Sequence, residues 1–263
     1  NDAPALKRAD VGVAMGIKGT EATKEAAEIV LADDNFSTIE RAVEEGRTIY
    51  DNLRKAILFI LPTNGAQGFV MLAAVVLGLT LPLTPVQILW VNMVVAVTLA
   101  LALAFEPAEP GVMQRPPRRP GAPIMDGAML WRVGFVSLLI GGATIVSFEY
   151  SLVQGMELQA ARTMAVNTLV AAQAWYLFNS RFLTASSLSP ARLFTNPAAQ
   201  VSVLVLALLQ LGFVYLPFMN TWFGTTPLAL EYWLPPLAIG ALVFLVIEAE
   251  KALQRRYGAR KSG

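Results

Sequence analysis

Long apolar stretches constrain this chain more than any other feature of its sequence. Six of them approach or exceed the roughly 20 residues that an α-helix needs to cross a bilayer. They are residues 56–79, 86–106, 130–153, 162–180, 198–218 and 232–250. The fourth is the weakest, because it carries Asn167, Gln173 and Asn179. We therefore predict a mostly α-helical membrane protein with a bundle of six transmembrane helices in residues 56–250.

The placement of lysine and arginine predicts how these helices are oriented. Both residues gather before the first stretch, between the second and third, between the fourth and fifth, and after the sixth, in the basic tail 251–263. The connecting segments 80–85, 154–161 and 219–231 contain neither. Because cytoplasmic loops are enriched in these cations, we predict that both termini are cytoplasmic. We also predict that the protein resides in the plasma membrane. Aromatic residues near the predicted outer ends suit a membrane interface: Tyr150, Tyr215, Trp222, Tyr232 and Trp233.

Composition excludes several classes of function. Charged residues make up 15% of the chain and the formal net charge is +1, so nucleic acid is not expected as a partner. The chain has no cysteine and no histidine, which excludes disulfides, zinc sites and thiolate sites for soft metals. Membrane lipid is the partner that this composition predicts.

The first 55 residues are more polar than the rest of the chain. The expected elements are a strand at 10–15, a helix at 19–27 capped by Thr20, and a strand at 28–32. Strand, helix and strand in so short a segment predict that residues 1–35 are the tail of an α/β domain. An amphipathic helix over 36–55 follows, and no Gly/Pro-rich linker separates it from the first apolar stretch. We predict one continuous helix from a cytoplasmic stalk into the membrane.

Amide side chains inside the apolar stretches are the candidate functional residues. Asn64 and Gln67 share a helix face in the first stretch, beside Pro62. Asn92 lies in the second stretch and Gln173 in the fourth. A polar group in lipid requires a partner, a water-filled cavity or a substrate. Each amide alone could equally be a structural hydrogen-bonding group between helices, but four of them on three helices favour a transport site.

The backbone near these amides also has unusual features. Pro62 has no N–H to offer the carbonyl of Leu58, and Gly65 and Gly68 permit another helix to approach closely. We therefore predict a cavity lined by amide and freed carbonyl oxygens. Glu106, at the end of the second stretch, is expected to reach the cytoplasmic interface.

Four segments of the chain, in sequence order, resemble motifs of one family of membrane proteins. Residues 1–16, from Asn-Asp-Ala-Pro to Met-Gly, resemble the end of the hinge motif, and 19–27 resemble the helix that follows it. Residues 87–92 resemble the sixth transmembrane helix, and 113–118 the loop after it. Together these motifs resemble P-type ATPases of the calcium- and sodium-pump branch, and the resemblance covers the whole chain. It implies transmembrane helices five to ten of an ATP-driven cation pump with alternating access, preceded by the end of a HAD-like phosphorylation domain.

The same resemblance implies where the chemistry of ATP takes place. Asn1 and Asp2 match residues beside the phosphorylated aspartate and its magnesium ion. The phosphorylated aspartate itself, the nucleotide-binding and actuator domains and helices one to four have no counterpart in this chain. We therefore expect a fragment that cannot hydrolyse ATP alone, with Mg²⁺ and ATP as cofactors of the full-length pump and the missing N-terminal part as its partner.

The positions that match the family's transported-ion ligands are Asn64, Gln67, Asn92, Val95, Ala96 and Gln173. Gln67 and Gln173 stand where calcium pumps have glutamate, and Ala96 stands where they have aspartate. Because a divalent cation in the membrane needs carboxylates for charge neutralisation, a standard two-calcium site is not expected. A cation pump is the main interpretation. A pump for a neutral or lipid-like substrate and a truncated, non-catalytic six-span membrane protein are the alternatives.

Overall fold

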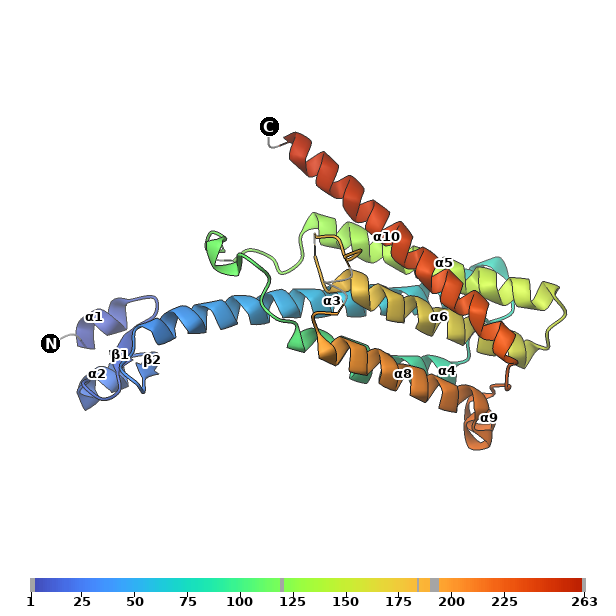
Figure 1. Cartoon of the computed structure of the whole chain (residues 1–263), viewed down its shortest axis with the longest axis horizontal. Coiled ribbons are helices and arrows are strands. Elements are labelled where there is room, and N and C mark those ends of the chain that lie inside the picture. The colour runs from blue at the N-terminus through green and yellow to red at the C-terminus, as the bar shows by residue number, and fades with distance from the viewer. Residues whose placement is uncertain (1–2, 119–120, 184, 190–193, 262–263) are drawn as a thin grey trace. The chain divides into compact units, whose positions relative to one another are not determined.

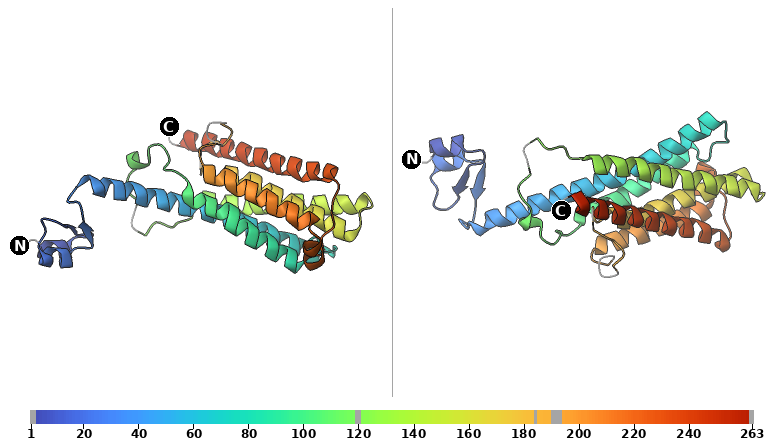
Figure 2. Two further views of the ribbon diagram at one scale, coloured as in Figure 1. Left: turned by 60° about the horizontal axis from the view of Figure 1, so that its bottom comes forward. Right: turned by 90° about the horizontal axis from the view of Figure 1, so that it is seen from above.

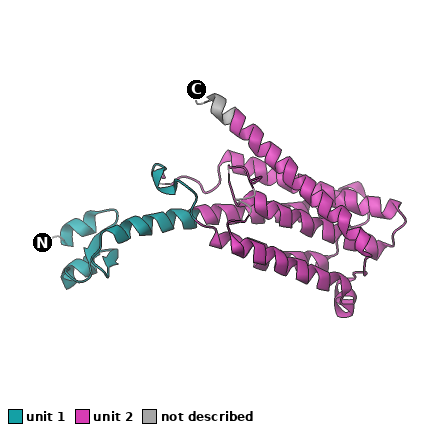
Figure 3. Cartoon of the chain, in the orientation of Figure 1, with its two compact units in different colours: residues 1–50, 108–117 teal, residues 51–107, 118–263 magenta. Residues whose placement is uncertain are grey.

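The computed structural model describes residues 3–118, 121–183, 185–189 and 194–261. The chain divides into two compact units (Figure 3). Unit 1 comprises residues 1–50 and 108–117, and unit 2 comprises residues 51–107 and 118–263. The predicted phosphate-site residues Asn1 and Asp2 lie outside the described residues.

Unit 1 begins with α1 (Ala3–Arg8), which the sequence did not predict, and continues with β1 (Val13–Met15), α2 (Glu21–Ala26) and β2 (Ile29–Leu31). The strands pair in parallel, which requires a crossover connection, and α2 lies within that connection. The Thr20 hydroxyl caps α2 by accepting from the N–H of Thr23 at 3.4 Å. The predicted strand, helix and strand are confirmed, and their assignment to a HAD-like domain stays a prediction.

Asp34 ties the turn after β2 to the turn after β1. Its carboxylate accepts hydrogen bonds from the backbone N–H groups of Ile17 and Lys18, both at 2.8 Å. The bond from Ile17 is the main cause that lowers the pKa of Asp34 below its ordinary value, because it favours the ionised form. Asp34 has a φ of 49°, in the left-handed region that aspartate enters more readily than most residues.

One uninterrupted helix, α3 (Ser37–Leu77), covers the predicted stalk and the first apolar stretch, as the sequence predicted. Its 41 residues contribute to both units. Within unit 1, the Arg47 guanidinium donates to the carbonyls of Val112 (2.8 Å) and Arg115 (2.9 Å). These bonds hold the Pro/Arg-rich segment around the short helix η3 (Val112–Gln114) as an ordered turn.

Unit 2 is a bundle of helices. Besides α3 it contains α4 (Pro85–Val95) with its continuations η1 (Ala96–Ala100) and η2 (Leu103–Phe105), α5 (Gly127–Val153), α6 (Leu158–Ser180), α8 (Pro197–Tyr215), α9 (Pro217–Phe223), η4 (Leu230–Trp233) and α10 (Leu234–Lys261). Among the described residues, five helices are long and apolar enough to cross a membrane: α3, α4 with its continuations, α5, α8, and α10 with η4. The chain is therefore a mostly α-helical membrane protein.

The α6 helix, which is the fourth predicted span, is long but less apolar than these five. It lies inside the bundle, against α5 and α10, and also contacts α4 and α8 (Figures 1 and 2). Because neighbouring helices rather than lipid surround it, its polar groups can find partners. The hydroxyls of Thr168 and Ser147 share a 2.7 Å hydrogen bond, and Asn179 donates to Glu248 at 2.8 Å. That the chain crosses the membrane six times stays a prediction.

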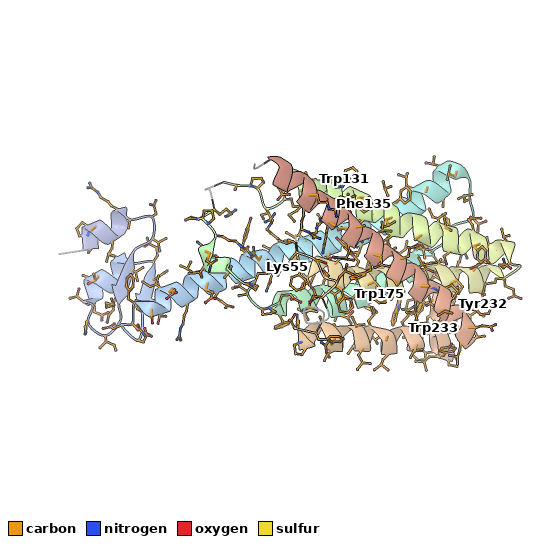
Figure 4. All side chains as sticks on the ribbon, turned by 45° about the horizontal axis from the view of Figure 1, so that its top comes forward. Lys55, Trp131, Phe135, Trp175, Tyr232 and Trp233 are labelled. Carbon is orange, nitrogen blue, oxygen red and sulfur yellow. The ribbon has the colours of Figure 1, made fainter. Side chains whose placement is uncertain are left out.

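The α10 helix crosses α6 at a glycine. A Cβ on Gly240 would lie 3.0 Å from the carbonyl oxygen of Ala171 and would also collide with the ring of Trp175. The Trp175 ring also packs against Phe244, with ring centroids 5.6 Å apart. Tyr232 and Trp233 lie at the opposite end of this helix from the basic tail (Figure 4).

Candidate functional site

The amides predicted from the sequence meet in one open-sided cavity between α3 and α4, with a volume of about 470 Å³. Asn64 and Gln67 line it from α3, while Asn92, Val95 and Ala96 line it from α4 and its continuation. Residues three apart on a helix share a face, which explains why the two α3 amides point to the same space. The structure thus brings together five of the six predicted ligand positions.

Two of these amides are hydrogen-bonded to each other. Gln67 Nε2 donates to Asn92 Oδ1 at 2.8 Å. The Gln67 side chain is buried, and its Oε1 has no hydrogen-bond partner among the described residues. Asn64 is exposed on the cavity wall. Leaving a buried acceptor unsatisfied costs about 1–3 kcal/mol, so Gln67 Oε1 is an oxygen that a ligand in this cavity would satisfy.

The sixth position, Gln173, is not brought into this cavity lining. It lies on α6, is fully buried, and neither its Oε1 nor its Nε2 has a hydrogen-bond partner among the described residues. Its role as a ligand stays a prediction.

The sequence analysis did not predict a second set of amide contacts. Trp90 Nε1 donates to Gln210 Oε1 at 3.4 Å, and Gln210 Nε2 donates to Asn167 Oδ1 at 2.8 Å.

Pro62 interrupts the hydrogen-bond pattern of α3 next to the cavity. A proline cannot donate to the carbonyl four residues earlier, which here is that of Leu58. The prediction that this freed oxygen lines the cavity is wrong. Leu58 is absent from the lining, and its carbonyl accepts from the hydroxyl of Tyr176 on α6 at 2.7 Å. The freed acceptor is used to bind α3 to α6.

The two glycines that follow Pro62 have different surroundings. A Cβ on Gly65 would collide with the hydroxyl of Ser137 on α5, so this glycine permits close helix approach, as predicted. A Cβ on Gly68 would meet nothing within 4 Å, and Gly68 lines the cavity. The second glycine therefore leaves room in the cavity instead of admitting another helix within the described chain.

The α4 helix becomes a π-helix beside the cavity, over Ala96–Ala100. The N–H of Ala96 donates to the carbonyls of both Asn92 and Met93, and the Thr98 hydroxyl donates to the carbonyl of Val94 at 2.7 Å. Such turns are rare and are frequent at functional sites. The sequence analysis missed this one, because the segment has no proline or glycine to indicate an irregularity.

No acidic or basic residue lines the cavity, and the described residues contain no group of three or more His, Cys, Asp or Glu side chains that could hold a metal ion. Two buried acids of unit 2 have other partners. Glu106, at the end of η2, is only 5% exposed and therefore buried within the protein, and its position at the cytoplasmic interface stays a prediction. It accepts from Arg181 Nε at 2.6 Å and from Asn196 Nδ2 at 2.7 Å. Glu248 pairs with Lys251 at 3.0 Å. These carboxylates hold helix ends together.

Comparison with known proteins places this geometry in a family. Residues 80–253 match the family described as "Cation transporting ATPase, C-terminus". The "Probable cation-transporting ATPase F" of Mycobacterium tuberculosis is 45% identical over 97% of this chain and 28% of its own length. "Cation-transporting ATPase pma1" of Synechocystis is 44% identical over 89% of this chain and 26% of its own length. The "Calcium-transporting ATPase" of Bacillus subtilis is 42% identical over 92% of this chain and 27% of its own length.

The chain spans less than a third of the length of these relatives. The family match includes α4, which forms one wall of the cavity, and the helices that enclose α6, whereas α3 precedes the matched residues. With its apolar helices, the chain is an integral membrane protein. It belongs to the cation-transporting P-type ATPases and corresponds to their C-terminal part.

Proposed function

We propose that this chain is the membrane-transport part of an ATP-driven cation pump, and that the cavity between α3 and α4 binds the transported cation. The observation that carries the proposal is the convergence of three amides, Asn64, Gln67 and Asn92, on one cavity inside apolar helices. Amide oxygens are hard ligands that suit cations such as Na⁺, K⁺ and Ca²⁺. In an apolar surrounding they also replace part of an ion's hydration shell.

The absence of carboxylates from the described lining bears on which cation is bound. A divalent ion in the membrane requires neutralising charge, and this part of the cavity supplies only neutral oxygens. We therefore propose a cation of low charge, or a divalent cation whose carboxylates come from the part of the pump that lies outside this chain. Gln173 remains a proposed further ligand from α6.

ATP hydrolysis in the cytoplasmic domains of the full-length pump would supply the energy for transport. ATP and Mg²⁺ act in the full-length pump, where phosphorylation and dephosphorylation of an aspartate drive alternating access of the cavity. Asn1 and Asp2 are proposed to lie near that phosphate and its magnesium ion. The continuous α3 helix supports this coupling, because it joins unit 1 to the residues of the cavity and can transmit movement to them. We place both termini in the cytoplasm and the pump in the plasma membrane.

The test uses the full-length pump and its vanadate-sensitive ATP hydrolysis, measured with NaCl, KCl and CaCl₂ in turn. We expect one of these salts to stimulate hydrolysis. Asn64→Ala and Asn92→Ala should each raise the half-maximal salt concentration at least about fivefold, because each removes a ligand oxygen worth roughly 1 kcal/mol or more. Gln154→Ala, which removes an exposed amide at the end of α5, is the matched control and should leave it unchanged.

Unchanged stimulation in both asparagine variants would remove the cavity assignment. Hydrolysis that responds to none of the salts would favour the second candidate, a pump for a neutral or lipid-like substrate, which the uncharged cavity lining also suits. A full-length gene product that lacks ATP hydrolysis altogether would favour a non-catalytic membrane protein.

A further inference from the structure

The hydrogen bond between Tyr176 and Leu58 lies where α3 is weakest. Without an N–H on Pro62, the turn between Leu58 and Pro62 has lost one of the bonds that keep a helix straight. The missing donor is replaced from another helix, since the Tyr176 hydroxyl donates to Leu58 O at 2.7 Å. Asn64 and Gln67 follow this turn directly, so the direction of the helix after Pro62 decides where both amides lie.

Tyr176 is itself held firmly. Its side chain is 1% exposed. Its ring stacks on that of Phe59, with centroids 5.8 Å apart and planes 17° apart, and Phe59 lines the cavity. On α6, the Ser180 hydroxyl donates to the backbone carbonyl of Tyr176 at 3.0 Å. Both the ring and the hydroxyl of Tyr176 therefore act on the two residues of α3 that begin the weakened turn.

A second neighbour holds the other side of the same turn. The hydroxyl of Ser137 on α5 lies 3.3 Å from the carbonyl oxygen of Pro62 and donates to its own helix at Val133 O, 2.7 Å away. It fits there because Gly65 has no side chain. The turn therefore contacts both α5 and α6, and among the described hydrogen bonds the one from Tyr176 on α6 supplies the donor that Pro62 lacks.

We propose that Tyr176 is a positioning residue for cation binding: through Leu58 O it sets the direction of α3 after Pro62, and so places Asn64 and Gln67 in the cavity. This inference rests on the proposed function of that cavity. Tyr176 does not line the cavity, so it acts through the α3 backbone and does not bind the ion.

A double-mutant cycle in the full-length pump tests this, with Tyr176→Phe, Pro62→Ala and the pair combined. An alanine in place of Pro62 restores the N–H that can bond to Leu58 O, so Tyr176 becomes dispensable. With NaCl, KCl and CaCl₂ as probes, Tyr176→Phe alone should raise the half-maximal concentration about fivefold or more, because it leaves a buried carbonyl unsatisfied. Added to the Pro62→Ala variant, the same change should have an effect of less than about twofold.

Tyr215→Phe is the matched control, since it removes a 2.7 Å bond from a tyrosine to the carbonyl of Leu228. It should leave the half-maximal concentration unchanged.

Equal effects of Tyr176→Phe in the wild-type pump and in the Pro62→Ala variant would overturn the proposal. So would a loss of maximal rate or thermal stability with no shift in the half-maximal concentration, which is the behaviour of a purely structural residue. If Pro62→Ala abolishes transport, the thermal unfolding midpoints of the wild type, the two single variants and the double variant replace the salt response as the readout. If Tyr176→Phe then lowers the midpoint equally with and without Pro62→Ala, the proposal is again refuted. Failure of the proposed function is recognised separately, because Asn64→Ala and Asn92→Ala would then also leave the salt response unchanged.

Discussion

Polar residues within unit 2 differ in how completely they are satisfied. Buried ionised groups such as Glu106, Arg181 and Lys251 have partners at hydrogen-bonding distance. Gln67 Oε1 and both side-chain polar atoms of Gln173 have none among the described residues. This division follows from cost, because an unpaired buried charge is far less tolerable than an unpaired buried amide. A neutral amide can therefore stay unpaired inside the bundle at a lower cost than a buried charge.

Removing Arg181 should be strongly destabilising. Its side chain is completely buried, and its loss leaves Glu106 as an uncompensated buried charge, which typically costs about 3–5 kcal/mol. Arg181→Met should lower the thermal unfolding midpoint of the purified pump sharply, and adding Glu106→Met should recover much of the loss. Lys24→Met serves as the control, because it breaks a pair with Glu21 on the surface of unit 1 that contributes less than about 1 kcal/mol. Similar midpoints for Arg181→Met and Lys24→Met would contradict this.

Close packing between helices depends on small residues at particular positions. Two adjacent glycines of α5 show how local this requirement is. A Cβ on Gly141 would lie 2.7 Å from a ring carbon of Phe69 and 2.9 Å from the carbonyl oxygen of Ala66, both on α3, whereas a Cβ on Gly142 would meet nothing within 4 Å. The sequence alone presents the two glycines as equivalent. Only the crossing of α5 and α3 distinguishes them.

Opposite effects are therefore expected from the same substitution at these neighbouring positions. Gly141→Ala should destabilise the pump by about 1–3 kcal/mol, because the added methyl group overfills the α3–α5 contact. Gly142→Ala should be neutral or stabilising by up to about 1 kcal/mol, since alanine favours helix more than glycine. Thermal unfolding of the two variants in the same detergent checks this, and a greater loss at Gly142 would refute the helix packing described above.

The whole molecule combines a small α/β unit with a helical membrane unit through one shared helix, α3. Unit 1 contributes only two short paired strands among its described residues. So small a sheet has little capacity to bury a core of its own. Its apolar side chains Val30 and Val43 are 45% and 43% exposed in a groove of about 830 Å³. Unit 1 therefore leaves apolar side chains exposed that its own small sheet does not cover.

Expressed alone, this chain should show no ATP hydrolysis above background. The described residues include no phosphorylated aspartate motif and no nucleotide-binding domain, and the chain spans less than a third of its relatives' length. Phosphate release from ATP with Mg²⁺, with and without vanadate, checks this against the full-length pump as the positive control. Vanadate-sensitive hydrolysis by the isolated chain would mean that its catalytic residues have been misidentified.

The sequence by itself determined the class of protein, the continuous α3 helix, the strand–helix–strand order and the presence of Asn64 and Gln67 on one face of α3. These follow from local periodicity and composition, which act over a few helical turns. Only the tertiary structure decided which residues those groups meet. The carbonyl oxygen of Leu58 accepts a hydrogen bond from Tyr176 and does not line the cavity. Glu106 is buried against Arg181, and Ala96 begins a π-helix. Each of these outcomes depends on contacts between segments far apart in the chain, and such contacts leave no regular pattern in the sequence.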